Sequence, residues 1–197
     1  MKIGSLCTGI GGLDLAVERL FDAELEWYCE VEKAPAQIMR AHYPTVRNYG
    51  DITSIAWDCL PPVDILTGGT PCQDVSIAGK RAGMTEGTRS NLWTNMRDAI
   101  NIIRPQFVVW ENVKAVKSAK AFSESDLESD DGQMGNLKAL GRVLGDLVEL
   151  GYDAEWTTLR AIDIGAPHWR PRVFLLATTD SPNPALADRN RNRLQAG

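Results

Sequence analysis

The sequence predicts an α/β domain built on a mostly parallel central sheet with helices on both faces. Short apolar runs, rich in β-branched and aromatic residues, alternate along the chain with segments of helical spacing. Such alternation is typical of parallel strands joined by crossover helices. A length of 197 residues and a hydrophobic content of 44% suit one globular domain with a sizeable core.

The expected strands are short and apolar, and the expected helices lie between them. The strands cover Ile3 to Cys7, Trp27 to Cys29, Val63 to Thr67, Phe107 to Trp110, Trp156 to Leu159 and Val173 to Ala177. Helical spacing predicts helices at 12–21, 33–43, 91–103 and 136–150. The last of these carries its apolar residues on one side, which is typical of a face packed on a core. The folded domain therefore extends over residues 1–179.

Two segments lack apolar periodicity. Residues 118–135 are acidic and contain Ser and Gly, so we expect an exposed loop there. Residues 180–197 are polar and contain Arg189, Arg191 and Arg193, and we expect a flexible C-terminal tail or one that docks on another molecule.

Charge and cysteine content exclude several classes of protein. A net charge of −5 and a pI near 5.1 argue against a protein that holds nucleic acid by its overall charge, although a local basic face is compatible with them. No apolar run approaches the roughly 20 residues that span a membrane, and the N-terminus lacks a signal-peptide pattern, so we expect a cytoplasmic protein. The four cysteines form no Cys-x-x-Cys pair and only His42 and His168 could assist them, so we expect no metal site.

The first strand runs into a glycine-rich turn, Thr8 to Gly12. Glycines there permit a tight turn and a close approach of the backbone to a ligand, although such turns also occur without ligands. Glu30 follows the second strand, where an acid can bind ribose hydroxyls; a solvated strand-end acid is the alternative. Together they indicate a nucleoside-containing cofactor. Asp51 can accept a hydrogen bond from an adenine amino group or cap the next segment, and the sequence alone favours the cap.

Cys72 follows the strand at Val63 to Thr67, on a loop shaped by glycine and proline. Ligands bind at the carboxyl ends of the strands in open α/β sheets, so this thiol is a candidate nucleophile once it is ionised. Cys7, Cys29 and Cys59 lie within or beside apolar segments, and we assign them to packing.

Glu111 follows the strand at Phe107 to Trp110 and would bring a carboxylate to the same edge of a parallel sheet; taken alone, a surface acid is the alternative. Arg170 and Arg172 precede the last strand. In an extended chain, residues spaced by two point the same way, so both arginines could face an anion or a catalytic loop; a solvated pair is the alternative.

These residues form an ordered set that is more specific than its parts. The set is Gly9-Ile10-Gly11-Gly12, Glu30, Gly50-Asp51-Ile52, Pro71-Cys72-Gln73, Glu111-Asn112-Val113 and Arg170-Pro171-Arg172. It resembles the catalytic-domain motifs of the cytosine-C5 DNA methyltransferases, over residues 2 to about 178. The segment from Ser76 to Gly83, and Leu92 after it, also look like that family. The resemblance implies a Rossmann-like sheet that binds S-adenosylmethionine and flips cytosine out of duplex DNA.

The resemblance also implies roles for individual residues. Cys72 would attack C6 of cytosine, Glu111 would contact N3 and stabilise the enamine, and Arg170 and Arg172 would position the flipped base or its phosphate. The implied cofactor-binding residues are Cys7, Thr8, Gly9, Gly11, Gly12, Glu30, Val31, Asp51, Ile52, Gly69, Pro71 and Leu92. The implied substrate-binding residues are Gln73, Ser76, Asn112, Val113 and His168. No metal is implied, and restriction-modification is one setting for such an enzyme.

Several features depart from that family. Val31 replaces a bulky residue, Cys7 an aromatic residue and His168 a glutamine, so we expect weaker cofactor binding. After Ala177 the family continues into a target-recognition region and a final segment, whereas about 20 residues remain here. Besides a complete enzyme, the alternatives are a truncated cofactor-binding module, half of a split methyltransferase whose second polypeptide supplies target recognition, and a methyltransferase that acts on cytosine in RNA.

Overall fold

The computed structural model describes residues 1–70, 92–118 and 139–181. Pro71, Cys72, Gln73 and Ser76 lie outside these residues, as do most of the expected acidic loop and nearly all of the C-terminal tail. The strands are β1 (Lys2–Leu6), β2 (Glu24–Cys29), β3 (Arg47–Asn48), β4 (Ile65–Gly68), β5 (Phe107–Val113), β6 (Asp153–Arg160) and β7 (Pro171–Thr178). The helices are α1 (Gly12–Phe21), α2 (Lys33–His42), α3 (Leu92–Ile103) and α4 (Ala139–Glu149), with 3-10 helices η1 (Ile52–Ser54), η2 (Trp57–Cys59), η4 (Lys114–Lys117) and η6 (Ala161–Ile164).

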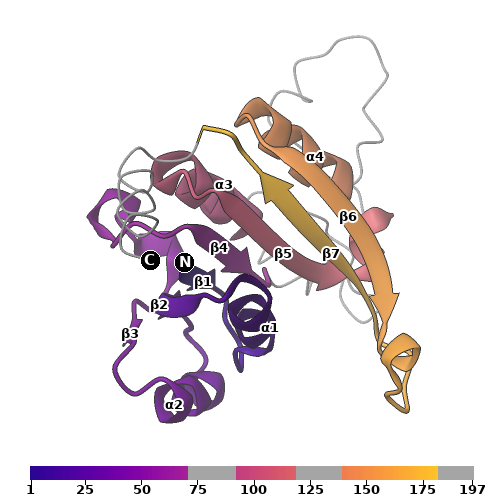
Figure 1. The fold of residues 1–197 in the computed structure, drawn as a ribbon, viewed down its shortest axis with the longest axis horizontal. Helices are drawn as coiled ribbons and strands as arrows, with labels where there is room; N and C mark the ends of the chain where they lie inside the picture. Colours follow the sequence, from indigo (N-terminus) through magenta and orange to yellow (C-terminus); the bar gives the residue numbers. More distant parts are fainter. Residues whose placement is uncertain (71–91, 119–138, 182–197) are drawn as a thin grey trace.

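The seven strands form one sheet in the order β3-β2-β1-β4-β5-β7-β6 (Figure 1). The pairs from β3 to β5 are parallel, whereas β7 is antiparallel to both β5 and β6. The predicted mostly parallel sheet is therefore confirmed. The reversal of β7 has a local effect, because it places Arg172, near the start of β7, beside Val113 at the end of β5.

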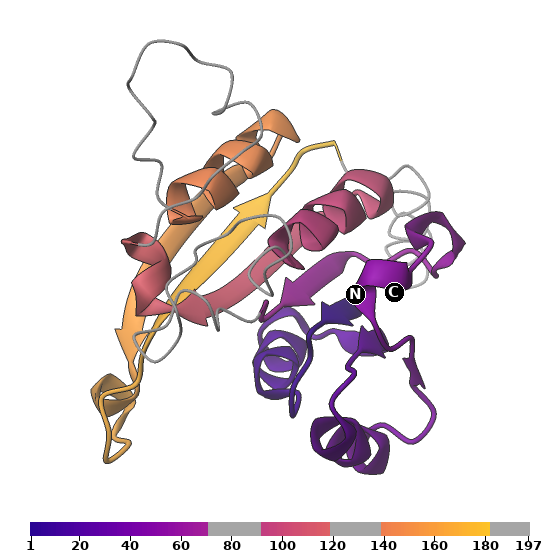
Figure 2. The ribbon, with the colours of Figure 1, turned by 180° about the vertical axis from the view of Figure 1, so that it is seen from behind.

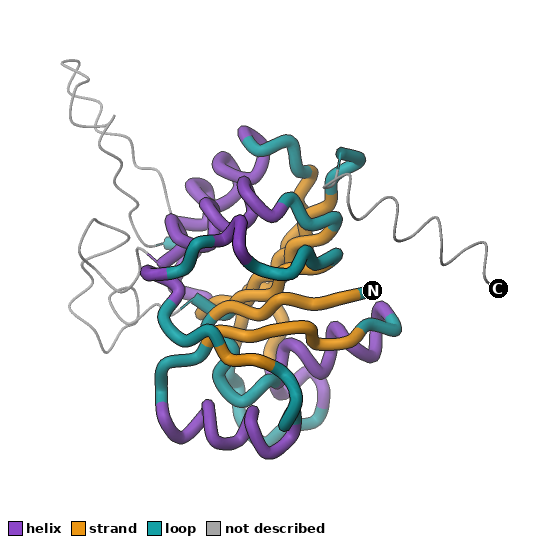
Figure 3. The backbone as a smooth tube through the Cα atoms, turned by 90° about the vertical axis from the view of Figure 1, so that its left-hand side faces the viewer, coloured by secondary structure: helices purple, strands orange, loops and turns teal. Residues whose placement is uncertain are grey.

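Helices lie on both sides of the sheet (Figures 2 and 3). The sheet separates two apolar cores, one on each face. Alternate strand residues point to opposite faces, so neighbours such as Ile65 and Leu66 of β4 contribute to different cores. Helices α3 and α4 bury one face with Met96, Ile100 and other apolar residues, and α1 and α2 cover the other. The prediction of helices on both faces is confirmed.

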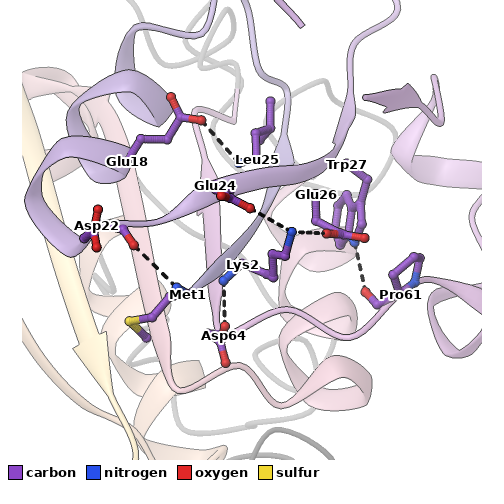
Figure 4. Close-up of polar contacts among 10 residues, drawn as sticks. All are labelled: Met1, Lys2, Glu18, Asp22, Glu24, Leu25, Glu26, Trp27, Pro61 and Asp64. Atoms are coloured by element: carbon purple, nitrogen blue, oxygen red, sulfur yellow. Dashed lines mark hydrogen bonds and ion pairs between the residues drawn. The ribbon is translucent and has the colours of Figure 1, made fainter. Parts of the chain in front are cut away.

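Polar contacts join the amino ends of the strands (Figure 4). The Lys2 ammonium lies 3.0 Å from the carboxylates of both Glu24 and Glu26, and the Lys2 backbone N–H donates to Asp64 at 2.6 Å. The Trp27 indole N–H donates to the Pro61 carbonyl at 2.9 Å. These bonds fasten β1, β2 and the segment before β4 at one edge, and the opposite edge holds the candidate site.

The structure extends several predicted elements and adds one. β5 continues through Glu111 to Val113, and β6 spans Asp153–Arg160 rather than four residues. The two-residue β3 was not predicted, because so short a segment has no periodicity. No helix in the described parts of the chain has the length and apolarity needed to cross a membrane.

Candidate active site

The glycine-rich turn lies at the carboxyl end of β1. Two of its residues, Gly9 at φ 58° and Gly11 at φ 79°, have left-handed backbone conformations, as does Cys7, at φ 51°, just before it. A Cβ at Gly11 would lie 2.7 Å from the Met39 sulfur, so this position requires glycine on two grounds. A Cβ at Gly9 or Gly12 would meet nothing within 4 Å, so the backbone there faces open space that a ligand can occupy.

Thr8 holds this turn together. Its hydroxyl donates to Ser5 Oγ at 2.9 Å, its backbone N–H donates to the Cys29 carbonyl at 3.2 Å, and its carbonyl accepts from the Gly11 N–H at 3.1 Å. Thr8 was predicted to bind cofactor; its hydrogen bonds fix the shape of the turn that would do so.

Glu30 lies between the turn and the end of β2. The Gly9 N–H donates to Glu30 Oε2 at 2.7 Å, and the Glu32 N–H donates to Oε1 at 2.7 Å. The Glu30 backbone N–H donates to the Asn48 amide oxygen, and the Asn48 amide donates back to the Glu30 carbonyl. With 9% exposure, Glu30 is no solvated strand-end acid, so that alternative is wrong. Asn48, which the sequence analysis missed, is its positioning residue.

The Cys7 thiol lies near two candidate cofactor-binding residues, Glu30 and Asp51. Burial, followed by the charges of Glu30 and Asp51, raises the pKa of Cys7 to about 12, because the thiolate would sit in a dry site beside two carboxylates. Asp51 accepts from the Thr53 N–H at 2.9 Å, so the predicted cap is confirmed. Ile52 is only 4% exposed and belongs to the core.

The residues around this turn suit a nucleoside group. Each oxygen of the Glu30 carboxylate accepts one backbone hydrogen bond in the structure and has a second lone pair for a ribose hydroxyl. Two apolar side chains at the same edge are exposed, Val31 at 63% and Ile10 at 65%. Ile10 was not among the predicted residues, although a large apolar residue between two glycines of the turn is the signal that could have identified it. Leu92 begins α3 and packs with Cys7 against the core on the α3 side.

Glu111 and Arg172 form an ion pair at the end of β5. Arg172 Nε lies 2.8 Å from Glu111 Oε1, and both side chains are less than one-third exposed. A Cβ at Gly69 would lie 3.8 Å from Glu111 Oε2 and 3.7 Å from the Cys7 carbonyl. The carboxylate, the end of β4 and the glycine-rich turn therefore meet at one edge, and a simple surface acid is the wrong interpretation of Glu111.

Thr70 is the last described residue before the segment that contains Cys72. Its hydroxyl accepts from the Trp110 indole N–H at 2.9 Å, and its carbonyl accepts from the Asn112 amide at 3.2 Å. Asn112 was predicted to bind substrate, but its side chain is 2% exposed and is committed to Thr70. The polar end of β5 thus fixes the backbone two residues before Cys72.

The two arginines of the predicted basic pair have different surroundings. Arg170 is exposed and has φ 28°, so the chain is not extended there and the argument from spacing by two does not hold. Arg172 lies within β7, opposite Val113. His168 is exposed in the segment between η6 and β7.

Cysteine packing was only partly predicted. Cys29 is buried and Cys7 partly buried, as expected, but Cys59 is exposed at the end of η2, so its assignment to packing is wrong. The short η2 turns its last residue outward. The described residues hold no group of three or more His, Cys, Asp or Glu side chains placed to share a metal ion.

A buried acid lies beneath the turn. Asp14, in the first turn of α1, is 1% exposed and accepts a hydrogen bond from the Thr67 hydroxyl. Its second oxygen has no hydrogen-bond partner among the described residues. Burial raises the pKa of Asp14 to about 6, despite hydrogen bonds from Thr67 and Ser5 that favour the ionised form.

Known proteins resemble this chain in sequence and in fold. A family model described as C-5 cytosine-specific DNA methylase matches residues 1–195. The chain is 29% identical over 211 residues to Type II methyltransferase M.NgoBV of Neisseria gonorrhoeae, which covers 100% of this chain and 47% of that protein. It is 32% identical over 177 residues to Type II methyltransferase M.NlaIV of Neisseria lactamica, which covers 85% of this chain and 39% of that protein. The chain thus spans less than half the length of these relatives.

Solved structures share the fold at lower sequence identity. The Dnmt2 methyltransferase of S. pombe superposes with a TM-score of 0.63 and 18% identity, over 93% of this chain and 52% of that one. A DNMT2 mutant of Spodoptera frugiperda superposes with a TM-score of 0.61 and 17% identity, over 91% of this chain and 50% of that one.

Proposed function

Because the chain belongs to the C-5 cytosine-specific DNA methylase family, we propose that it transfers a methyl group from S-adenosylmethionine to C5 of cytosine in duplex DNA. The observation that carries the proposal is that Glu111, paired with Arg172, lies beside the end of β4. The chain reaches Cys72 four residues after that strand. A thiol nucleophile that follows in the chain so soon after an edge bearing a carboxylate suits addition to a pyrimidine ring.

In the proposed reaction the Cys72 sulfur forms a bond to C6 of the flipped cytosine. As this bond forms, the electrons of the C5–C6 double bond shift to C4–C5 and those of the C4–N3 double bond to N3, which takes a proton carried by Glu111 and returns it when the sulfur leaves. C5 of this enamine is nucleophilic and would take the electrophilic methyl group that S-adenosylmethionine, held by Glu30 and the glycine-rich turn, would supply. Loss of the C5 proton to a base and departure of the Cys72 sulfur from C6 restore the aromatic ring.

Arg172 orients this carboxylate in the proposed site. Its Nε contacts one carboxylate oxygen, and the other, Oε2, faces Gly69. Glycine at position 69 leaves room beside that oxygen for the edge of a base. Arg170 is exposed at the start of β7 and is available to a phosphate of the DNA.

S-adenosylmethionine supplies an electrophilic methyl group when it is bound. We assign its ribose to Glu30, its adenine to Asp51 and Val31, and its methionine part to the backbone of Gly9 and Gly12. The open space beside both glycines and the spare lone pairs of Glu30 support this assignment.

Covalent trapping tests the proposed reaction. Mixed-sequence duplex DNA in which 5-fluorocytosine replaces cytosine, together with S-adenosylmethionine, should give a complex that survives denaturation, because fluorine at C5 blocks the elimination step. Cys72→Ala should abolish the complex, and Cys59→Ala, which removes an exposed cysteine, should leave it intact. Trapping that persists in Cys72→Ala would reject this nucleophile. Comparing methyl incorporation into duplex DNA and tRNA tests the RNA alternative.

A second candidate is a methyltransferase part that acts together with a further polypeptide supplying target recognition. The observation that favours it lies on β6 and β7 at the border of the sheet, where Leu159 is 48% and Leu176 is 38% exposed. Figure 1 shows where these two strands lie. In the pairing register these two side chains lie on the same face as Glu111. Apolar residues in that position suit a covering segment. Trapping by the 197-residue chain alone would exclude a partner that is required for the chemistry.

A further inference from the structure

The connection between β6 and β7 carries exposed apolar side chains at the catalytic edge of the sheet. β6, η6 and β7 form an arm that extends beyond the end of β5 (Figure 1). On this arm Ile164 is 83% and Trp169 is 62% exposed. Ile162, 44% exposed, belongs to the same arm, so its exposed apolar side chains together make the arm a candidate binding surface.

The arm is ordered by its own contacts. Arg160 Nη2 lies 2.6 Å from Asp163 Oδ1, and the Ala161 N–H donates to the Trp169 carbonyl at 2.9 Å. The Arg160 guanidinium also lies over the Trp169 ring, 4.9 Å from its centroid. Trp169 is therefore held in place from one side while most of its surface stays accessible, so binding there would cost little conformational entropy.

The arm is also tied to the proposed catalytic residues. Trp169 precedes Arg172 by three residues, so their backbones are at most about 11 Å apart. Arg172 in turn contacts Glu111. Because nucleotides in duplex DNA rise by about 3.4 Å, a cytosine at Glu111 would bring the DNA within about three nucleotides of Trp169.

The charge of the arm suits a polyanion, in contrast to the net charge of −5 of the whole chain. Its one acid from Arg160 to Arg170, Asp163, is neutralised by Arg160. Arg170 is exposed and forms no ion pair within the described residues. Arg170 thus gives the arm one unneutralised positive charge beside Trp169.

We propose that Trp169 is a DNA-binding residue whose indole stacks on a base or sugar within about three nucleotides of the target cytosine. Ile164, on the same arm, contacts the DNA groove beside that nucleotide. The inference rests on the proposed function for the position of the target. An aromatic side chain can stack on any of the DNA bases. Stacking therefore suits a contact with nucleotides that flank the reacting cytosine.

Binding measurements separate stacking from charge. Trp169→Ala should weaken binding of a fluorescein-labelled mixed-sequence duplex about tenfold, while the slope of log Kd against log salt stays unchanged, because no phosphate contact is lost. Trp169→Phe should recover most of the affinity. Trp156→Ala is the matched control, because Trp156 is 42% exposed and lies back along β6. Unchanged affinity in Trp169→Ala, or a loss equal to that in Trp156→Ala, would overturn the proposal.

Photocrosslinking locates the contact independently of the chemistry. With 5-iodouracil in place of thymine in the duplex, irradiation should crosslink DNA to the peptide that contains Trp169, and mass spectrometry would identify it. Crosslinking only elsewhere would reject the contact. Irradiation is carried out both on non-covalent complexes and on complexes trapped with 5-fluorocytosine. A failure of trapping would count against the proposed reaction. The non-covalent complexes would still test the contact of Trp169 with DNA.

Discussion

Arg172 Nε lies 2.8 Å from Glu111 Oε1, and this contact joins two strands that run in opposite directions. The two residues are not directly opposite one another in the sheet, since Glu111 pairs with Phe174 and Arg172 pairs with Val113. The ion pair is therefore a diagonal contact between next neighbours on the same face of the sheet, within reach of a long side chain.

Arg172→Gln should lower the methylation rate about 100-fold, because the Glu111 carboxylate loses the group that orients it. The free energy of unfolding should change by about 1 kcal/mol or less, since the pair is only partly buried. Tritiated methyl incorporation and urea unfolding measure the two effects. Lys2→Gln, which removes ion pairs at the opposite edge of the sheet, should leave the rate unchanged. An equal loss of rate in both variants would contradict the proposed role of Arg172.

Thr70→Val should reduce both stability and methylation. It leaves the buried Trp110 N–H without its acceptor, which costs about 1–3 kcal/mol. It also removes the hydroxyl contact that helps to fix the backbone leading to Cys72, although the Asn112 amide can still donate to the carbonyl of residue 70. Thr70→Ser retains the hydroxyl and should restore both properties to near the original values. If the serine variant failed as badly as the valine variant, the methyl group rather than the hydroxyl would be the important part of Thr70.

Gly12→Ala should stabilise the free protein while weakening its binding of S-adenosylmethionine. Alanine is favoured over glycine inside a helix by about 0.5–1 kcal/mol, and a Cβ at Gly12 meets nothing within 4 Å. The same Cβ would occupy space assigned to the cofactor. Gly145→Ala in α4 is a matched control, because its Cβ also meets nothing within 4 Å, and it should stabilise without affecting binding. Thermal unfolding and calorimetric titration measure the two effects.

Asp14→Asn should change how stability depends on pH. Burial raises the pKa of Asp14 from 3.8 to about 6, so the folded protein releases this proton at a higher pH than the unfolded chain does. Ionisation of Asp14 therefore lowers the stability of the original protein as pH rises from about 4 to 6, by up to about 3 kcal/mol. The asparagine variant lacks this loss.

Urea unfolding at pH 4 and pH 7 checks this expectation. The stability of the Asp14→Asn variant, relative to the original protein, should rise between the two values. Asp98→Asn, which changes an exposed residue of α3, should give the same difference at both. A flat difference for Asp14→Asn as well would mean that the carboxyl ionises normally in the fold.

The fold was largely predictable from the sequence, because its strands are continuous apolar runs and its helices have apolar faces. The prediction failed where polar side chains find partners far along the chain. Glu111 and Asn112 read as the end of a strand, yet β5 continues through both, since Arg172 pairs with one and Thr70 accepts from the other. Partners 42 and 61 residues away are not visible in a local pattern.

The candidate site was predicted by order of residues more than by geometry. The place of Glu30 after β2 could be predicted from the sequence. The two hydrogen bonds that hold its backbone come from Asn48 of β3, a strand that was not predicted. Arg170 and Arg172 were treated alike because the left-handed conformation of Arg170 cannot be inferred from residue spacing. The contribution of Thr70 was missed because threonine after two glycines has no distinctive signal.

The reversal of β7 makes some changes of chain length tolerable and others not. The pairing of β7 with β5 fixes the position of Arg172. The part of the arm between η6 and β7 is exposed and contributes little to the register of this pairing. Insertions or deletions in the arm could therefore alter the surface offered to a partner while the ion pair stays in place. A single-residue deletion between Arg172 and Leu175 would instead place these two side chains, which now point to opposite faces, on the same face of the sheet, so that either Leu175 leaves the core or Arg172 leaves Glu111. Strand register therefore makes changes of length after Pro171 more damaging than changes before it.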